Sequence, residues 1–159
     1  PRATDDLHHE IERVVASGVS GSEIAKEDAQ DHVFGYAVGL DLTRRDLQAQ
    51  AKKMKRPWDF GKSFEQAAPI TAITQTKSCE HLSSGEISLT VNDKVQQIGN
   101  LNQLIWNVPE IISFLSQFYQ LEAGDLIFTG TPAGVGPLHR GDKLIGRVAS
   151  LPELVVNII

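Results

Sequence analysis

The sequence predicts a β-rich α+β domain in which short strands outnumber helices. Apolar runs of strand length recur along the chain and are separated by turn residues such as Gly, Pro and Asn. Only two longer segments look helical, and each is one-sided in its polarity. The 159 residues show no internal repeat, low-complexity tract or shift in composition, so one domain is expected rather than two.

The N-terminal part of the chain is predicted to contain two strands. Residues 1–6 are polar and indicate a loop. The segment 8–16 is typical of a strand that leads into a turn at 18–21. The segment 33–42 is an apolar, aromatic run of strand length with a carboxylate at its end. A short helix over 26–32 is expected between the two strands.

A helix is expected after the second strand, with Thr43 as its N-cap residue. Asp46, three residues later, completes a T-x-x-D variant of the capping box. The sequence RRDLQAQAKKM that follows Thr43 is rich in good helix formers. Pro57 and Gly61 then predict an irregular loop over residues 56–68.

A hairpin and a second helix are predicted next. Residues 86–92 alternate as a strand, and Asn92-Asp93 is a turn before a partner strand that begins near Val95. Asn107 is the predicted N-cap of the helix, and Pro109 suits its first turn. The apolar residues of this helix fall on one stripe: Val108, Ile111, Ile112, Leu115, Phe118 and Tyr119.

The C-terminal part is predicted to contain strands joined by a glycine-rich loop. A turn at 122–125 leads into the strand LIFTG, and the loop GTPAGVGP follows at 130–137. This loop lacks the Lys-Ser/Thr of a P-loop, so it is expected to be a structural turn, although Thr131 could place a hydroxyl in a site. A turn at 140–142 precedes a terminal strand region near 155–158.

Charge and composition argue against several classes of function. Fifteen basic and twenty acidic residues give a net charge of −5, which disfavours nucleic acid as a partner. No apolar run approaches the roughly 20 residues of a membrane span, so no membrane partner is expected. The single cysteine, Cys79, excludes an internal disulfide framework, lies in no nucleophile motif, and is typical of a reducing, cytoplasmic location.

Three carboxylates form a candidate metal site. Glu10 and Glu12 lie two apart on a predicted strand, so their side chains share one face, where they repel each other unless a cation neutralises them. Asp41 ends the next strand and could supply a third oxygen ligand of the kind that Mg²⁺ and Mn²⁺ prefer. An exposed strand face and an ordinary strand-end aspartate are the alternatives. His8 shares the face of the pair and is interpreted as a hydrogen-bonded neighbour.

Basic and amide side chains nearby are candidates for binding an anionic substrate. The planar fork of Arg44 or Arg45 suits a carboxylate, and Lys62 would supply a point charge. Helical spacings of three and four place Gln48 and Asp41 near Arg45. The alternative is a solvated helix face, which is the interpretation preferred for the following basic residues, Lys52, Lys53, Lys55 and Arg56.

Four ordered motifs stand out along the chain: L-H-H-E-I-E at 7–12, G-L-D-L-T-R-R-D-L-Q at 39–48, R-P-W-D-F-G-K-S-F at 56–64 and G-D-L-I-F-T-G-T-P-A-G-V-G-P at 124–137. Together they resemble the fumarylacetoacetate hydrolase family, most of all its bacterial fumarylpyruvate and acylpyruvate hydrolases. The resemblance runs from about Asp6 to the C-terminus. It implies a mixed β-sandwich roll with flanking helices, and a homodimer.

The resemblance also implies a site. Mg²⁺ or Mn²⁺, with Ca²⁺ as a non-native occupant, would be held by the residues matching Glu10, Glu12 and Asp41. Substrate contacts would come from the residues matching Arg45, Gln48, Lys62 and Thr131, with Lys62 also catalytic. Family hydrolases take their general base from a His–Glu pair on an N-terminal lid. Nothing before Leu7 matches that pair and the chain begins without Met, so we expect residues 1–159 to be a single catalytic domain without the lid.

The implied activity is metal-dependent hydrolysis of the carbon–carbon bond of an acylpyruvate, releasing pyruvate, as in aromatic catabolism. Fumarylpyruvate is the favoured substrate among small 2-oxo acids. The same site could instead serve an oxaloacetate decarboxylase or tautomerase, or a 2-oxo diacid isomerase, because all of these reactions pass through an enolate. A fragment that binds metal without activity is a further alternative, and a nucleic-acid-binding module is the least favoured.

Overall fold

The computed structural model describes residues 2–159, so only Pro1 of the predicted N-terminal loop lies outside it. In this part of the chain the strands form three antiparallel sheets. One has the order β5 (Thr74–Gln75), β3 (Val33–Leu40), β2 (Ile11–Ser17), β8 (Leu126–Phe128). The second has the order β11 (Leu154–Asn157), β10 (Lys143–Val148), β6 (Glu86–Val91), β7 (Lys94–Asn100). The smallest has the order β4 (Thr43–Arg44), β1 (Leu7–His9), β9 (Gly136–Leu138).

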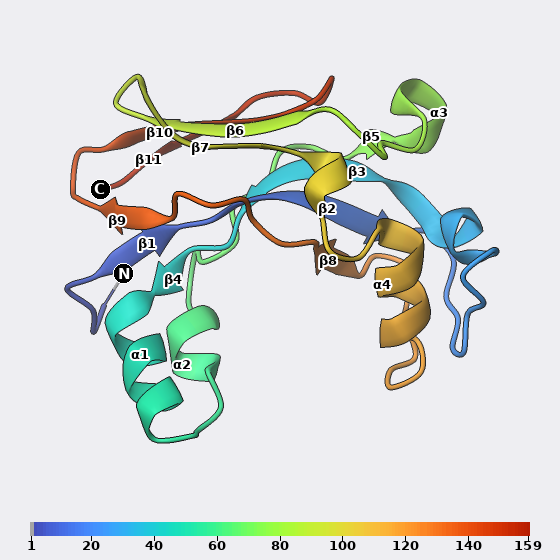
Figure 1. The fold of residues 1–159 in the computed structure, drawn as a ribbon, viewed down its shortest axis with the longest axis horizontal. Coiled ribbons are helices and arrows are strands. Elements are labelled where there is room, and N and C mark those ends of the chain that lie inside the picture. Colours follow the sequence, from blue (N-terminus) through green and yellow to red (C-terminus); the bar gives the residue numbers. More distant parts are fainter. Residues whose placement is uncertain (1) are drawn as a thin grey trace.

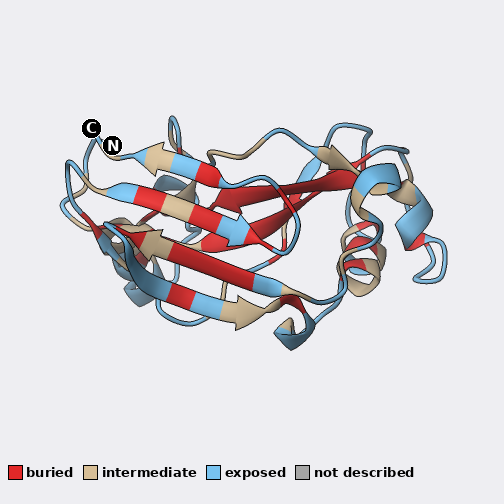
Figure 2. Ribbon diagram, turned by 90° about the horizontal axis from the view of Figure 1, so that it is seen from above, coloured by how far each residue is buried: buried red, intermediate tan, exposed pale blue. Residues whose placement is uncertain are grey.

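The two four-stranded sheets stack face to face as a sandwich (Figure 1). A Cβ added to Gly146 of β10 would lie 2.6 Å from Ile11 Cδ1 of β2, which shows how closely the sheets approach. Every residue of β2 is buried, and buried residues concentrate on the inner strands (Figure 2). The core between the sheets is aliphatic and includes Ile11, Val15, Val38, Leu89, Leu144 and Val148.

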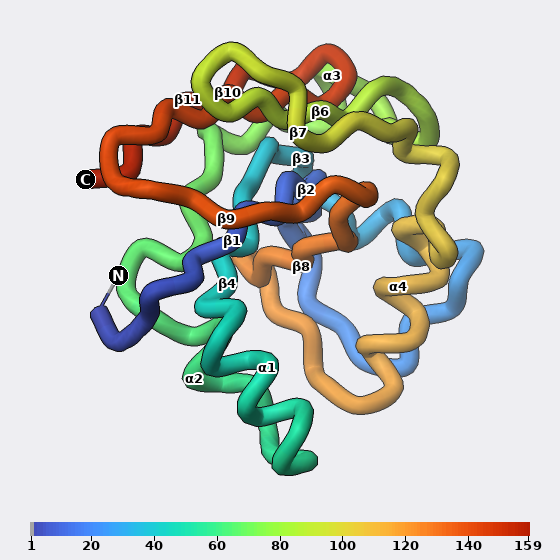
Figure 3. Tube along the Cα trace, turned by 60° about the vertical axis from the view of Figure 1, so that its left-hand side comes forward, coloured from blue at the N-terminus to red at the C-terminus, as the bar shows by residue number. Residues whose placement is uncertain are grey.

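Helices flank the sandwich at its two ends. The helices α1 (Arg45–Lys53) and α2 (Asp59–Lys62) pack together and extend away from the sheets (Figures 1 and 3). At the other end α4 (Val108–Leu115) packs on the 3₁₀ helix η1 (Ala29–His32). The short helices α3 (Thr76–Cys79) and η2 (Leu101–Gln103) lie in connections. Among the described residues no helix combines the length and apolarity needed to cross a membrane.

Local sequence signals predicted the hairpin and the second helix correctly. The strands β6 and β7 pair through a turn in which Asn92 and Asp93 have φ values of 50° and 63°, the left-handed conformation that tight hairpins need. At the start of α4, Asn107 Oδ1 accepts a hydrogen bond from the Glu110 N–H, and the Glu110 carboxylate accepts one from the Asn107 N–H. This reciprocal pair is a capping box.

The predicted helix start at Thr43 is wrong. Thr43 lies in β4, and α1 begins at Arg45 without a side-chain cap. The Asp46 carboxylate accepts hydrogen bonds from Thr4 Oγ1 and the Asp5 N–H instead of closing a capping box. Contacts with the N-terminal segment therefore override the local capping signal.

Three other boundaries differ from the prediction. The predicted strand 8–16 is divided at Glu10 into β1 and β2, which belong to different sheets. The helix α4 ends at Leu115, so Phe118 and Tyr119 do not extend its buried stripe and are 65% and 66% exposed. The predicted loop 56–68 contains α2.

Candidate metal centre and substrate site

The fold brings three predicted carboxylates to one point. Glu10 lies at the break between β1 and β2, Glu12 lies in β2, and Asp41 directly follows β3. One oxygen from each carboxylate lies within 4.8 Å of the others. Because β2 and β3 pair antiparallel and the Asp41 N–H donates to the Glu10 carbonyl oxygen at 2.9 Å, the two chain segments stay together beyond the regular ladder.

Glu12 is the most buried of the three carboxylates, with 4% of its surface exposed. Its Oε2 accepts a hydrogen bond of 2.6 Å from the Gly130 N–H of the glycine-rich loop. Burial raises the pKa of Glu12 to about 7, and the charges of Asp41 and Glu10 act in the same direction, while the Gly130 hydrogen bond opposes the rise. Without a cation, this carboxyl group therefore holds a proton close to neutral pH.

Lys62 brings a positive charge from α2 to the cluster. Its ammonium group donates hydrogen bonds to Glu10 Oε2 at 2.8 Å, to Asp41 Oδ2 and to Thr43 Oγ1 at 2.7 Å. Burial alone would raise the pKa of Glu10, but Lys62 and Arg45 outweigh it and the pKa lies below its usual value. For Asp41 burial outweighs Lys62, so its pKa is raised.

Arg45 links the cluster to the first turns of α1. Its Nη2 donates to Glu10 Oε1 at 2.6 Å and its Nη1 donates to Gln48 Oε1 at 2.6 Å. Its Nε donates to His8 Nδ1 at 3.3 Å, and the other nitrogen of this imidazole lies 2.9 Å from Asp6 Oδ1. His8 is thus a hydrogen-bonded neighbour, and the predicted spacing of Arg45 and Gln48 corresponds to a direct contact.

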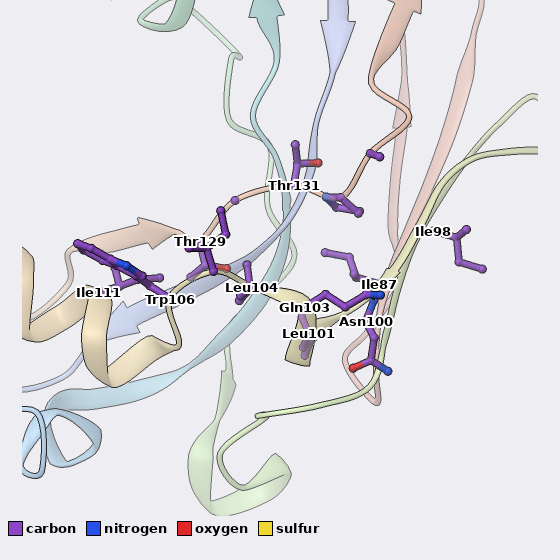
Figure 4. Close-up of a pocket in the computed structure, with 14 residues that line it drawn as sticks. Ile87, Ile98, Asn100, Leu101, Gln103, Leu104, Trp106, Ile111, Thr129 and Thr131 are labelled. Carbon is purple, nitrogen blue, oxygen red and sulfur yellow. The ribbon is translucent and has the colours of Figure 1, made fainter.

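The fourth substrate candidate, Thr131, lies on the glycine-rich loop. A Cβ on Gly134 would lie 2.1 Å from the Gln96 carbonyl oxygen, and the φ of Gly134 is +102°, so this loop can approach β7 so closely only with glycine there. Thr131 lines a pocket of about 810 Å³ together with Thr129 and apolar side chains of β6, β7, η2 and the start of α4 (Figure 4).

This pocket adjoins the carboxylates without containing them. Its lining includes Gly130, whose N–H binds Glu12, but none of the three carboxylates. Its other walls are mostly apolar, with Leu101, Leu104 and Ile111 among them. The glycine-rich loop is therefore the common wall of a charged cluster and an apolar cavity.

The donor set fits a hard divalent cation. Three carboxylate oxygens are the ligands that Mg²⁺ and Mn²⁺ prefer, and they leave positions for water and substrate on an octahedral ion. The pKa of Glu12 is raised mainly by burial and further by the charges of Asp41 and Glu10, and a bound cation would favour the charged form of the carboxylate.

Sequence reasoning missed two buried polar residues beside this site. Gln97 is fully buried in β7 and His9 is 1% exposed at the end of β1. In β7 the polar Gln97 is buried while the apolar Ile98 next to it is 60% exposed, the reverse of the usual arrangement in a strand. The sequence gives no signal of that inversion, because it depends on the approach of the glycine-rich loop.

Comparisons with known proteins identify relatives of this chain. The family model described as fumarylacetoacetate (FAA) hydrolase C-terminal matches residues 1–158. A fumarylpyruvate hydrolase of Ralstonia sp. is 44% identical over 99% of this chain and 82% of its own length. A mitochondrial oxaloacetate tautomerase of Mus musculus is 40% identical over 91% of this chain and 65% of its own length.

A solved structure extends the agreement to the fold. The crystal structure of fumarylpyruvate hydrolase from Pseudomonas aeruginosa, in complex with Mn²⁺ and pyruvate, superposes with a TM-score of 0.99 at 46% identity. The match covers 100% of this chain and 68% of that one. On the family match, the similarity of sequence and the shared fold, this chain belongs to the fumarylacetoacetate hydrolase family.

Proposed function

We propose that this chain hydrolyses the carbon–carbon bond of an acylpyruvate with the help of a divalent metal ion, and that fumarylpyruvate is its preferred substrate. The observation that carries the proposal is the convergence of Glu10, Glu12 and Asp41 next to the ammonium group of Lys62. Similarity to relatives named fumarylpyruvate hydrolase, one of them in complex with Mn²⁺ and pyruvate, supports the choice of substrate and ion.

Glu10, Glu12 and Asp41 would hold Mg²⁺ or Mn²⁺. When bound, the ion would supply positive charge for the carboxylate and 2-oxo oxygens of the substrate. Hydrolysis joins the hydroxyl of a water molecule to the acyl carbon and leaves the electron pair of the broken carbon–carbon bond on the pyruvate fragment, whose CH2 carbon then takes up the proton released by the water. The ammonium group of Lys62 stabilises the negative charge that develops there.

Arg45 and Gln48 would keep the reacting groups in register. Arg45 binds both Glu10 and Gln48, so the carboxylate and the amide are fixed relative to α1 before substrate arrives. Such preorganisation lowers the entropic cost of reaching the reactive geometry.

An assay with two substrates tests this proposal. Purified protein is incubated with fumarylpyruvate or with oxaloacetate in Mn²⁺, in Mg²⁺ and in EDTA. We expect release of pyruvate from fumarylpyruvate with either ion and none in EDTA. Turnover of oxaloacetate without turnover of fumarylpyruvate would refute the proposed substrate, and full activity in EDTA would refute the metal dependence.

Oxaloacetate tautomerisation is the second candidate. The mouse relative named oxaloacetate tautomerase favours it, because it is 40% identical to this chain over 144 aligned residues. The same carboxylates, with Lys62, could stabilise the enol form of a 2-oxo diacid. Conversion of enol to keto oxaloacetate faster than in a protein-free control, with no pyruvate released, would support this candidate.

A homodimer is also part of the proposal. Large apolar side chains are exposed beside α4, including Ile105, which is 96% exposed, and Trp106, whose ring contacts Phe114 edge to face. Exposed apolar groups of this kind are typical of association surfaces. Light scattering coupled to size exclusion would show twice the mass of one chain, and the mass of one chain would refute the dimer.

A further inference from the structure

A single buried amide connects the two halves of the site. Gln97 Oε1 accepts hydrogen bonds from the Ile11 N–H at 3.1 Å and from His9 Nδ1 at 2.9 Å. Gln97 Nε2 donates to the Pro132 carbonyl oxygen at 2.8 Å and to Thr131 Oγ1 at 2.7 Å. All four hydrogen-bonding positions of this amide are used within the protein.

The orientation of this amide is fixed by two backbone groups. The Ile11 N–H can only donate, and the Pro132 carbonyl oxygen can only accept. Oε1 and Nε2 of Gln97 therefore cannot be exchanged. Two consequences follow for the side-chain partners: His9 must carry its proton on Nδ1, and Thr131 Oγ1 must accept from the amide.

The same contacts attach the candidate metal ligands to the glycine-rich loop. His9 and Ile11 flank Glu10 in the sequence, so Gln97 holds the chain on both sides of this carboxylate. Thr131 and Pro132 follow Gly130, whose N–H binds Glu12. The approach of Gly134 to the Gln96 carbonyl oxygen holds this loop against β7, where Gln97 lies.

We propose that Gln97 is a positioning residue that orients the Thr131 hydroxyl so that it donates a hydrogen bond to an anionic oxygen of the substrate. Because the amide N–H occupies a lone pair of Thr131 Oγ1, the hydroxyl hydrogen is directed elsewhere. Thr131 lines the pocket beside the carboxylates, where an acylpyruvate presents carboxylate and developing enolate oxygens (Figure 4). The inference rests on the proposed function for the placement of substrate at Thr131.

Replacing the Gln97 amide with a carboxylate, which can only accept hydrogen bonds, tests the inference. In Gln97→Glu the new carboxylate still accepts from Ile11 and His9, but it also accepts from the Thr131 hydroxyl, which then cannot donate to substrate. We expect kcat/KM to fall about 10- to 100-fold, mainly through KM, because a hydrogen bond to a charged group is lost. Thr131→Val should cause a similar loss, and Thr131→Ser should retain most of the activity.

The double variant separates positioning from a general structural effect. If Gln97 acts through Thr131, Gln97→Glu combined with Thr131→Val loses no more activity than Thr131→Val alone. Losses that multiply in the double variant would overturn the proposal, whatever the melting temperature of Gln97→Glu, because this variant also loses the hydrogen bond to the Pro132 carbonyl oxygen. Calorimetric titration of pyruvate in the presence of Mn²⁺ should show the same pattern in affinity, without any need for turnover.

A spectroscopic measurement tests the hydrogen-bond direction separately from the proposed function. Long-range ¹H–¹⁵N spectra of the wild-type protein report which nitrogen of His9 carries the proton. We expect the proton on Nδ1, and a proton on Nε2 alone would overturn the inference. Absence of turnover of every 2-oxo acid, with the proton on Nδ1 and pyruvate binding weakened by Thr131→Val, would refute the proposed reaction and leave the inference standing.

Discussion

In the metal-free protein, the contribution of Glu12 to the free energy of unfolding should fall as the pH rises toward neutrality. The pKa of Glu12 is about 7 in the folded protein, against 4.5 for an ordinary glutamate. The folded state therefore holds this proton more tightly than the unfolded state does, and the resulting stability is complete below pH 4.5 and lost by about pH 7. The difference of about 2.5 pKa units corresponds to roughly 3 kcal/mol at 1.36 kcal/mol per unit.

Thermal unfolding in EDTA between pH 5 and pH 8 measures this loss. For a chain of this size about 3 kcal/mol corresponds to roughly 6–12 °C in melting temperature. The buried imidazole of His9 acts in the opposite direction, because burial lowers its pKa and its contribution is lost as the pH falls. The informative quantity is therefore the wild-type curve minus the curve of Glu12→Gln, which lacks the titrating group.

The control for this comparison is Glu27→Gln, which removes an exposed carboxylate far from the cluster in sequence. It should leave the pH dependence of wild type unchanged. Added Mn²⁺ should restore the stability of wild type above pH 7 and have little effect on Glu12→Gln, since the ion takes the place of the proton. Identical pH profiles for wild type and Glu12→Gln would refute the assignment of a buried, protonated carboxyl group to this position.

Three other substitutions have defined outcomes. Lys62→Met should lower kcat about 10²- to 10³-fold, because the charge that stabilises the enolate is lost. Mn²⁺ should bind at least as tightly as in wild type, because a cation next to the carboxylates is removed. Weaker Mn²⁺ binding in calorimetry would contradict this. Gly134→Ala should lower the free energy of unfolding by at least about 1–3 kcal/mol in urea denaturation, since the φ of Gly134 is +102° and a Cβ would meet the Gln96 carbonyl oxygen. An unchanged midpoint of urea unfolding would show that the loop can move. Arg13→Met should raise the free energy of unfolding by about 1 kcal/mol in urea denaturation, because Arg13 is 2% exposed and forms no ion pair among residues 2–159. A marked fall in melting temperature would show that its hydrogen bond to the Leu82 carbonyl oxygen and its contact with the Tyr36 ring outweigh the cost of burying its charge.

The predictable parts of the fold are those whose causes lie within a few residues. Asn107 and Glu110 cap each other across one turn, and Asn92-Asp93 sets the geometry of its own hairpin, so the sequence alone was sufficient for both. The helix start at Thr43 failed for the opposite reason. Asp46 has a partner at Thr4, 42 residues away, and local capping preferences cannot include that competitor.

The site also combines features that nearby residues predict with features that depend on distant residues. The spacing of Glu10 and Glu12 and the position of Asp41 after a strand predicted three carboxylates that the structure brings together. The burial of Gln97 depends on the close approach of Gly134, which is 37 positions later in the chain, so neither residue alone indicates it. Long-range polar contacts of this kind are what a single sequence does not reveal.

The metal centre is tested most directly by anomalous diffraction at the manganese absorption edge from crystals grown with Mn²⁺ and pyruvate. We expect one strong peak bound by oxygens of Glu10, Glu12 and Asp41, with pyruvate beside it and within reach of Lys62. Absence of a peak at these carboxylates, or a peak held by other residues, would contradict the proposed metal centre.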